Sequence, residues 1–138
     1  MNVSDYMTVK VFTLVAGKKL FIALDIMNWA HVRHVPVVDR AGRVVGLISH
    51  RDVLRASISA LSTTVANLER DQHLWTIPIE SVMSKDVQTI APDADVRQAA
   101  KLMRESKIGC LPVVENEKLV GIITEYDLLR LAEEYGGA

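Results

Sequence analysis

Hydrophobic positions along the chain follow two spacings, one typical of strands and one typical of helices. Short runs rich in β-branched residues predict strands at residues 9–14, 34–38, 44–48, 87–90, 110–114 and 118–123. Between these runs, apolar residues recur every three or four positions, which predicts helices with one apolar face. These helices begin near residues 20, 49 to 52, 96 and 125. The order β-α-β-β-α therefore occurs twice, which indicates an α+β fold.

The order recurs because the sequence itself is duplicated. Met7 aligns with Met83 at an offset of 76 residues, and Pro-Val-Val occurs at the matching positions 36–38 and 112–114. The second copy lacks one residue in a charged turn, so that Gly46 aligns with Gly121 at an offset of 75. A single-residue deletion of this kind is typical of an exposed hairpin turn.

The size of each copy indicates that the copies depend on each other. A unit of about 60 residues buries only about 60% of its unfolded surface, which is marginal for independent stability. We therefore expect the two units to pack about a pseudo-two-fold axis as one module with a cleft along the axis. The expected boundaries are a first unit at 1–69, a linker at 70–80 and a second unit at 81–138.

Each copy contains a strand that ends in Ser/Thr-x-x-Asp at the start of a helix. The residues are Ser49 and Asp52 in the first copy, and Thr124 and Asp127 in the second. The hydroxyl, the carboxylate and the free N–H groups of the first helical turn gather at this corner. Such a corner is either a capping box, which needs no ligand, or a place where a ligand binds. The local pattern leaves both interpretations open.

Composition narrows the function classes. The net charge is −1 and there is no basic block, so the many Lys/Arg–phosphate contacts of a nucleic-acid-binding protein are not expected. The single cysteine, Cys110, excludes an intrachain disulfide framework and fits a reducing compartment. Residues 1–10 lack the apolar core of a signal peptide, and no apolar run reaches the roughly 20 residues that cross a membrane. We expect a cytoplasmic protein without a membrane contact.

Taken together, the order, spacing and duplication of these motifs resemble a tandem pair of CBS (cystathionine-β-synthase) domains, known as a Bateman module. The motifs are Met7-Thr8, Val82-Met83-Ser84, the segments 34–39 and 110–114, and both Gly-apolar-apolar-Ser/Thr-x-x-Asp segments. The resemblance covers nearly the whole chain. It implies a non-catalytic regulatory module that binds AMP, ADP, ATP or S-adenosylmethionine in the cleft between its units and signals to a partner protein. The nucleotide would be a regulatory ligand, and no cofactor is expected.

The resemblance also assigns roles to residues. Asp52 and Asp127 would accept hydrogen bonds from ribose hydroxyls, and such charge-assisted bonds are about twice as strong as neutral ones. Ser49, Thr124 and the N–H groups of the following helices would bind phosphate. The adenine would lie against the segments before the prolines, Arg33-His34-Val35 and Gly109-Cys110-Leu111. Because the opening strand of one unit often serves the other unit's site in this family, Thr13 is paired with Asp127, and Thr89 with Asp52.

The second site is the one that fits the family pattern better. Its helix begins with Pro92-Asp93-Ala94-Asp95, whereas the first copy has Ala16-Gly17-Lys18-Lys19 at the equivalent place. Two lysines at a helix start oppose the positive end of the helix dipole. We therefore favour the corner at Asp127 as the working nucleotide site.

Other function classes remain as alternatives. The main alternative is a structural dimerisation module without a ligand. Catalysis is not expected, because no nucleophile–base pair, phosphate loop or zinc-binding histidine pair is recognisable. The family implies a homodimer and an effector protein in trans. Cys110 is expected to be an inert core thiol, Trp29 and Trp75 to be packing or interface residues, and the Leu54–Leu68 stripe to be mostly core.

Overall fold

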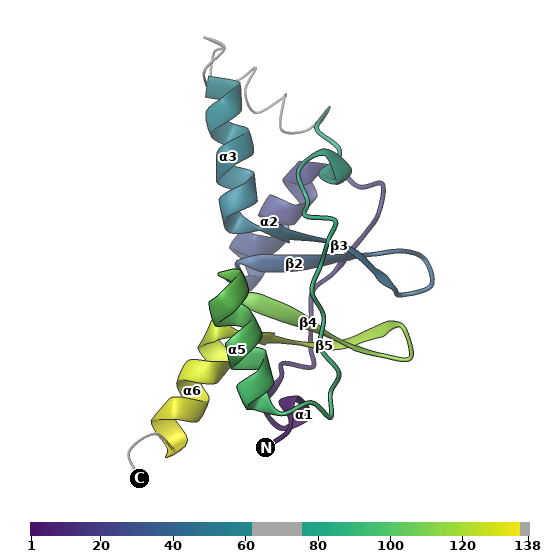
Figure 1. Cartoon of the computed structure of the whole chain (residues 1–138). Coiled ribbons are helices and arrows are strands. Elements are labelled where there is room, and N and C mark those ends of the chain that lie inside the picture. The colour runs from purple at the N-terminus through teal and green to yellow at the C-terminus, as the bar shows by residue number, and fades with distance from the viewer. Residues whose placement is uncertain (62–75, 136–138) are drawn as a thin grey trace. The chain divides into compact units, whose positions relative to one another are not determined.

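The computed structural model describes residues 1–61 and 76–135 of the chain (Figure 1). The elements follow one another in the order helix α1 (Val3–Tyr6), strand β1 (Leu14–Val15), α2 (Leu20–Ala30), β2 (His34–Val38), β3 (Val44–Ser49), α3 (His50–Leu61), 3-10 helix η1 (Ile79–Ser81), α5 (Val96–Ser106), β4 (Cys110–Glu115), β5 (Lys118–Thr124) and α6 (Glu125–Tyr135). This mixed architecture confirms the predicted α+β class. Within the described residues, no helix combines the length and the apolar character needed to cross a bilayer.

The chain forms two compact units, and the first eleven residues belong to the C-terminal one. The Asp52 unit comprises Phe12–Val87, and the Asp127 unit comprises Met1–Val11 together with Gln88–Ala138. The N-terminal segment joins the Asp127 unit through a pair of backbone hydrogen bonds between Thr8 and Ile122, of 2.8 and 2.9 Å. Each unit therefore combines the helix and hairpin of one repeat with the opening segment of the other. The predicted limits of the linker fall partly outside the described residues.

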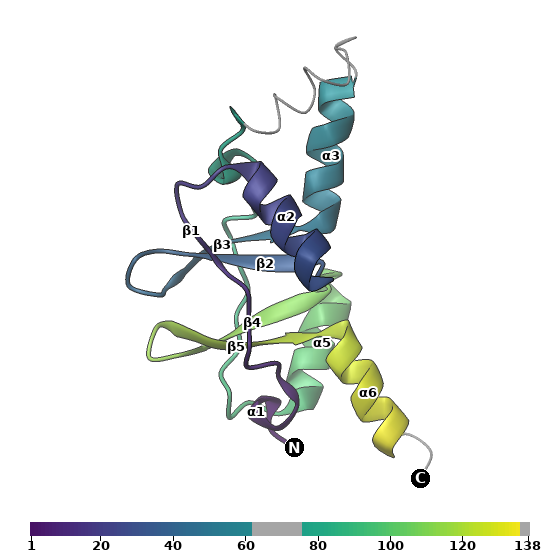
Figure 2. The same cartoon turned by 180° about the vertical axis from the view of Figure 1, so that it is seen from behind.

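The Asp52 unit is built on a three-stranded sheet in the order β1-β2-β3. Strand β1 runs parallel to β2, and β3 runs antiparallel to β2 (Figure 2). Pro36 lies in β2, which is the central strand of this sheet. The proline is accommodated because pairing with β1 starts only at the next residue, where Leu14 lies opposite Val37. The buried cluster of this unit contains Leu14, Leu20, Ala23, Met27, Val35, Val37, Ile48, Val53 and Ile79.

The Asp127 unit is built on the β4–β5 hairpin, whose antiparallel register places Cys110 opposite Thr124. Helix α5 begins after Asp95, whose carboxylate accepts a hydrogen bond from the N–H of Arg97 at 2.8 Å. The predicted apolar face of this helix is confirmed, since Val96, Ala99 and Met103 are buried. The buried cluster of this unit contains Val3, Tyr6, Ile90, Val96, Ala99, Met103, Leu111, Val113 and Ile123.

The two opening strands are much shorter than predicted. A two-residue strand, Leu14–Val15, replaces the strand expected at residues 9–14 and overlaps it only at Leu14. Ile90 forms a single bridge to Val113 where residues 87–90 were expected to form a strand. Val9 is 69% exposed, so its β-branched side chain packs on no sheet face. Strand propensity reflects the fit of a side chain to a half-buried sheet, and these segments lack such a neighbour over most of their length.

Glycine at both motif positions permits close approach of the opening segments. A Cβ added to Gly121 would lie 2.7 Å from Met7 Sδ and 3.0 Å from the carbonyl oxygen of Thr8. At Gly46 it would overlap the side chain of Met83. The methionine and glycine that mark each repeat in the sequence therefore contact each other in space, with the methionine of one repeat against the glycine of the other.

Candidate functional site

The corner at Asp127 is a complete capping box. The Asp127 carboxylate accepts hydrogen bonds at Oδ2 from the backbone N–H of Thr124, at 2.9 Å, and from its Oγ1, at 3.2 Å. In return the N–H of Asp127 donates to Thr124 Oγ1 at 3.4 Å. These bonds satisfy N–H groups that the start of α6 would otherwise leave without an acceptor. The corner therefore stabilises the helix start in the absence of a ligand.

Asp127 also connects the N-terminal segment to α6. Its second oxygen, Oδ1, accepts a hydrogen bond from Thr8 Oγ1 at 3.4 Å and lies 3.9 Å from Arg130 Nη2. The same Arg130 nitrogen donates to the carbonyl oxygen of Tyr6 at 3.2 Å. Asp127 is buried, with 2% of its surface exposed. A buried carboxylate is costly unless it is hydrogen-bonded, and here both of its oxygens have partners within the protein.

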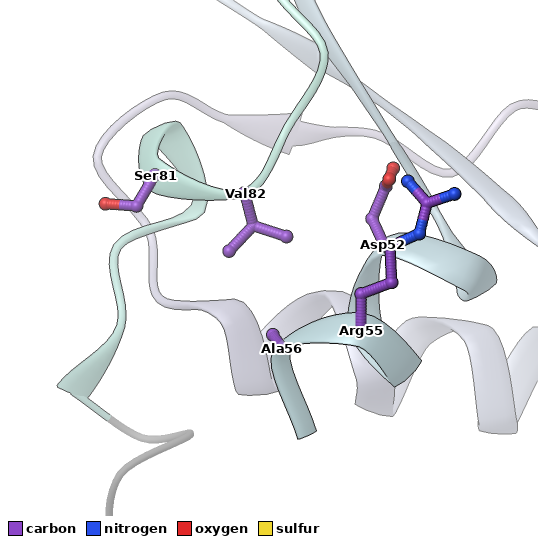
Figure 3. Close-up of a pocket in the computed structure, with 5 residues that line it drawn as sticks. All are labelled: Asp52, Arg55, Ala56, Ser81 and Val82. Atoms are coloured by element: carbon purple, nitrogen blue, oxygen red, sulfur yellow. The ribbon is translucent and has the colours of Figure 1, made fainter. Parts of the chain in front are cut away.

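The corner at Asp52 has the same local geometry but a more open environment. The N–H of Ser49 donates to Asp52 Oδ2 at 2.8 Å, and the N–H of Asp52 donates to Ser49 Oγ at 3.1 Å. Asp52 is half-buried. It lines a pocket of about 330 Å³ whose described lining residues are Asp52, Arg55, Ala56, Ser81 and Val82 (Figure 3).

Sequence reasoning missed the other polar residues of this pocket. Arg55 lies one turn after Asp52 on α3, and Ser81 ends η1. Figure 3 shows the Val82 side chain pointing into the space between its own segment and α3. The available signal was the repeat itself, because Arg55 aligns with Arg130 at the same offset that aligns the two aspartates.

The segments predicted to face adenine do lie beside the corners. His34 is opposite Ser49 in the sheet register, and the N–H of His50 donates to the carbonyl oxygen of Arg33 at 2.8 Å. Equivalently, the N–H of Glu125 donates to the carbonyl oxygen of Gly109 at 3.0 Å. Val35 and Leu111 are both 0% exposed, so their side chains belong to the cores. These two residues can offer a ligand their backbone groups only.

Cys110 is a buried thiol. It is 2% exposed, and burial together with the charge of Glu125 raises its pKa to about 12. Because the thiolate is the reactive form, the side chain is unreactive at neutral pH. This agrees with its expected role as a core residue.

The opening-strand threonines are both exposed. Thr13 belongs to the Asp52 unit and Thr89 to the Asp127 unit, so each lies in the unit opposite to its predicted aspartate. The pairings stay predictions. Trp75 lies outside the described residues, whereas Trp29 is 75% exposed. Over residues 1–61 and 76–135, no cluster of three or more His, Cys, Asp or Glu side chains is arranged to hold a metal ion.

Comparison with known proteins agrees with the duplicated architecture. The chain matches the CBS domain family twice, over residues 3–59 and 79–134. It is 34% identical over 130 residues to a CBS domain-containing protein of Dictyostelium discoideum, which covers 94% of this chain and 89% of that protein. It is also 34% identical over 131 residues to the homoserine O-acetyltransferase of Methanococcoides burtonii, where it matches only 24% of the enzyme's length.

A solved structure extends the comparison to a liganded protein. The CBS domain pair of protein MJ0100, in complex with 5′-methylthioadenosine and S-adenosyl-L-methionine, is 27% identical to this chain. The superposition has a TM-score of 0.80 and covers 97% of each chain. With both repeats matched and the fold shared over nearly its full length, this chain belongs to the CBS domain family and contains a pair of CBS domains.

Proposed function

We propose that this CBS pair is a regulatory module that binds an adenosine-containing ligand. The observation that carries the proposal is the MJ0100 complex, in which a CBS pair with the same fold over 97% of its length holds two adenosine compounds. The proposed contacts are made at the Ser/Thr-x-x-Asp corners. Their carboxylates are suited to vicinal ribose hydroxyls, because an ionised carboxylate accepts two hydrogen bonds that are stronger than neutral ones.

Both corners already hold their carboxylates in place for this role. Ser49 and Thr124 fix one oxygen of the neighbouring aspartate through a backbone N–H group, at 2.8 and 2.9 Å. A pre-positioned acceptor loses little conformational freedom when a ligand binds. A ribose would still have to compete with the hydrogen bonds that these side chains make within the protein.

The output of the proposed module is a change in its contacts with a partner protein. In the homoserine O-acetyltransferase relative, the matching segment is 24% of a longer enzyme, which supports a role as an attachment to a catalytic unit. We propose an effector in trans for this chain. A ligand can shift such a contact only to the extent that it binds one arrangement of the module more tightly than the other.

We also propose that the module forms a homodimer through exposed apolar side chains on its helices. In the Asp127 unit, Tyr126 and Leu129 on α6 are 74% and 69% exposed. In the Asp52 unit, Trp29 on α2 is 75% exposed and Leu54 on α3 is 49% exposed. Tyr126 and Leu129 are three positions apart on α6, a spacing that places two side chains next to each other on a helix surface. A mass of one chain at every concentration in light scattering would contradict the dimer.

Thermal unfolding with a panel of AMP, ADP, ATP, 5′-methylthioadenosine and S-adenosylmethionine tests the proposal. A compound that binds the folded state raises the unfolding temperature, by an amount that grows with its concentration. We expect at least one compound to do so at millimolar concentration, and guanosine compounds to serve as the control. No shift with any adenosine compound would instead support the alternative, a dimerisation module without a ligand. Chromatography of the nucleotide after incubation checks that it is returned unchanged.

A further inference from the structure

The five methionines of the chain include two pairs that the repeat relates to each other. Met27 on α2 and Met103 on α5 form one pair, and both are buried, with 3% and 5% of their surface exposed. Met7 and Met83 form the other pair, in the two opening segments, and both are half-buried. Met1 has no equivalent and is 56% exposed. The repeat therefore places two thioethers inside the cores and two at positions that solvent partly reaches.

Each half-buried methionine packs on a glycine through its sulfur. A Cβ added to Gly121 would lie 2.7 Å from Met7 Sδ and 3.1 Å from its Cγ. A Cβ added to Gly46 would overlap Met83 Sδ and would lie 2.9 Å from both Cγ and Cε. The sulfur is the nearest atom in both units. The thioether therefore fills the space that a side chain would take at the glycine, and an atom added to the sulfur has little room on that side.

This packing adjoins the backbone pairing that attaches each opening segment to its hairpin. The residue after each methionine pairs with the residue after its glycine. Thr8 and Ile122 exchange backbone hydrogen bonds of 2.8 and 2.9 Å, and Ser84 and Leu47 exchange bonds of 2.9 and 3.0 Å. Both pairings are isolated bridges rather than parts of a longer ladder. The methionine contact is thus the packing next to a pairing that only two hydrogen bonds hold.

The same segments lie beside both aspartates. Thr8 Oγ1 donates to Asp127 Oδ1 at 3.4 Å. Val82, which precedes the second methionine, lines the pocket together with Asp52. A change at either methionine therefore acts on a segment that contacts or faces one of the two Ser/Thr-x-x-Asp corners.

We propose that Met7 and Met83 are sites of reversible oxidation, at which a hydroperoxide converts the thioether to a sulfoxide and loosens the opening segment. The sulfur donates an electron pair to the outer peroxide oxygen, the S–O bond forms and the O–O bond breaks. The remaining oxygen keeps the proton and leaves as an alcohol, or as water when the oxidant is hydrogen peroxide. The sulfoxide is polar and larger than the thioether, so it disrupts the apolar contact until a reductase removes the oxygen. This proposal goes beyond the proposed ligand binding and does not depend on it.

Oxidation of the native full chain with hydrogen peroxide, followed by peptide mass spectrometry, tests the sites. We expect Met1 to react first and Met7 and Met83 next. Met27 and Met103 should react at least about tenfold more slowly than this second pair, because the oxidant reaches them only when the core opens. Equal rates for the two pairs, or faster reaction of Met27 and Met103, would overturn the assignment.

Thermal unfolding and hydrogen exchange test the consequence. The oxidised protein should unfold about 3–10 °C lower, the shift expected for a polar group left unsatisfied in a packed contact. The peptides that contain Thr8 and Ser84 should lose protection from exchange, and treatment with reductases for both sulfoxide epimers should restore protection and unfolding temperature. An unchanged unfolding temperature with both methionines oxidised would overturn the proposal.

The matched control replaces the two sulfurs and keeps apolar side chains of similar volume. The double variant Met7→Leu, Met83→Leu should keep its unfolding temperature after the same peroxide treatment. A loss as large as that of the wild type would show that oxidation acts at another residue, and the assignment would fail. Each single leucine variant should lose exchange protection only in the unit that keeps its methionine. The single variants and the site-resolved mass spectra decide the question if the double variant does not fold.

Discussion

Replacing Asp127 with alanine is expected to destabilise the protein more than the same change at Asp52. Both substitutions remove a capping carboxylate, which costs about 0.5–2 kcal/mol. Each change also leaves one backbone N–H without its acceptor, that of Ser49 or that of Thr124. Only Asp127→Ala leaves two hydroxyl donors, those of Thr124 and Thr8, without theirs as well, and an unsatisfied buried donor costs about 1–3 kcal/mol. The nearby Arg130 side chain is 47% exposed and adds little. We expect a loss of about 2–4 kcal/mol for Asp127→Ala and about 1 kcal/mol for Asp52→Ala.

Urea unfolding followed by circular dichroism and by tryptophan fluorescence measures both losses, with coincident curves as the check on two-state behaviour. Losses equal within about 0.5 kcal/mol would show that the buried contacts of Asp127 carry no extra stability.

A double-mutant cycle isolates the contact with the N-terminal segment. Thr8→Val removes the donor to Asp127 Oδ1 and keeps the shape of the side chain. The cycle of Thr8→Val with Asp127→Ala should give a coupling energy of at least about 0.5 kcal/mol, as contacting residues do. Coupling indistinguishable from zero would mean that the 3.4 Å contact is not a stabilising hydrogen bond.

Further predictions concern the backbone approach and the titrating groups. Gly121→Ala should cost about 1–3 kcal/mol in urea unfolding and more than Gly46→Ala, because the added Cβ meets the Thr8 backbone in the first case and only a flexible methionine in the second. Because the folded-state pKa of Cys110 is raised to about 12, the native protein at pH 8 should react slowly with a thiol reagent, and a rapid reaction would contradict the burial of the thiol. The contribution of this thiol to the free energy of unfolding should be complete below the unfolded-state pKa of about 8.5 and should decline as the pH rises toward 12. The Tyr135 hydrogen bond is the main cause that raises the pKa of Tyr6 to about 12, so Tyr135→Phe should move one tyrosine titration downward in an ultraviolet pH titration.

The local pattern of apolar, turn and capping residues in the sequence was sufficient to predict the helices and the β-hairpins. Helix α6 begins at Glu125, as predicted, and β2 spans the predicted residues His34–Val38. These elements are set by interactions over a few residues: the 3.6-residue period of apolar positions, the Ser/Thr-x-x-Asp caps, and the turn residues between paired strands. The duplication in the sequence also predicted the CBS family and the α+β fold class. A repeated order of motifs is specific for a family even where each single motif is a weak signal.

The tertiary structure decided which opening segment joins which hairpin and how the two aspartates differ. The contact of Thr8 with Ile122 spans most of the chain, and no local period encodes a pairing over that distance. The same Ser/Thr-x-x-Asp motif is closed at Asp127 and open at Asp52 because the residues that fill or leave the adjacent space, Tyr6 and Val82, come from distant segments. Side-chain volume has a consequence only once packing has placed it against a neighbour, so the sequence determined the capping motif and the fold determined its accessibility.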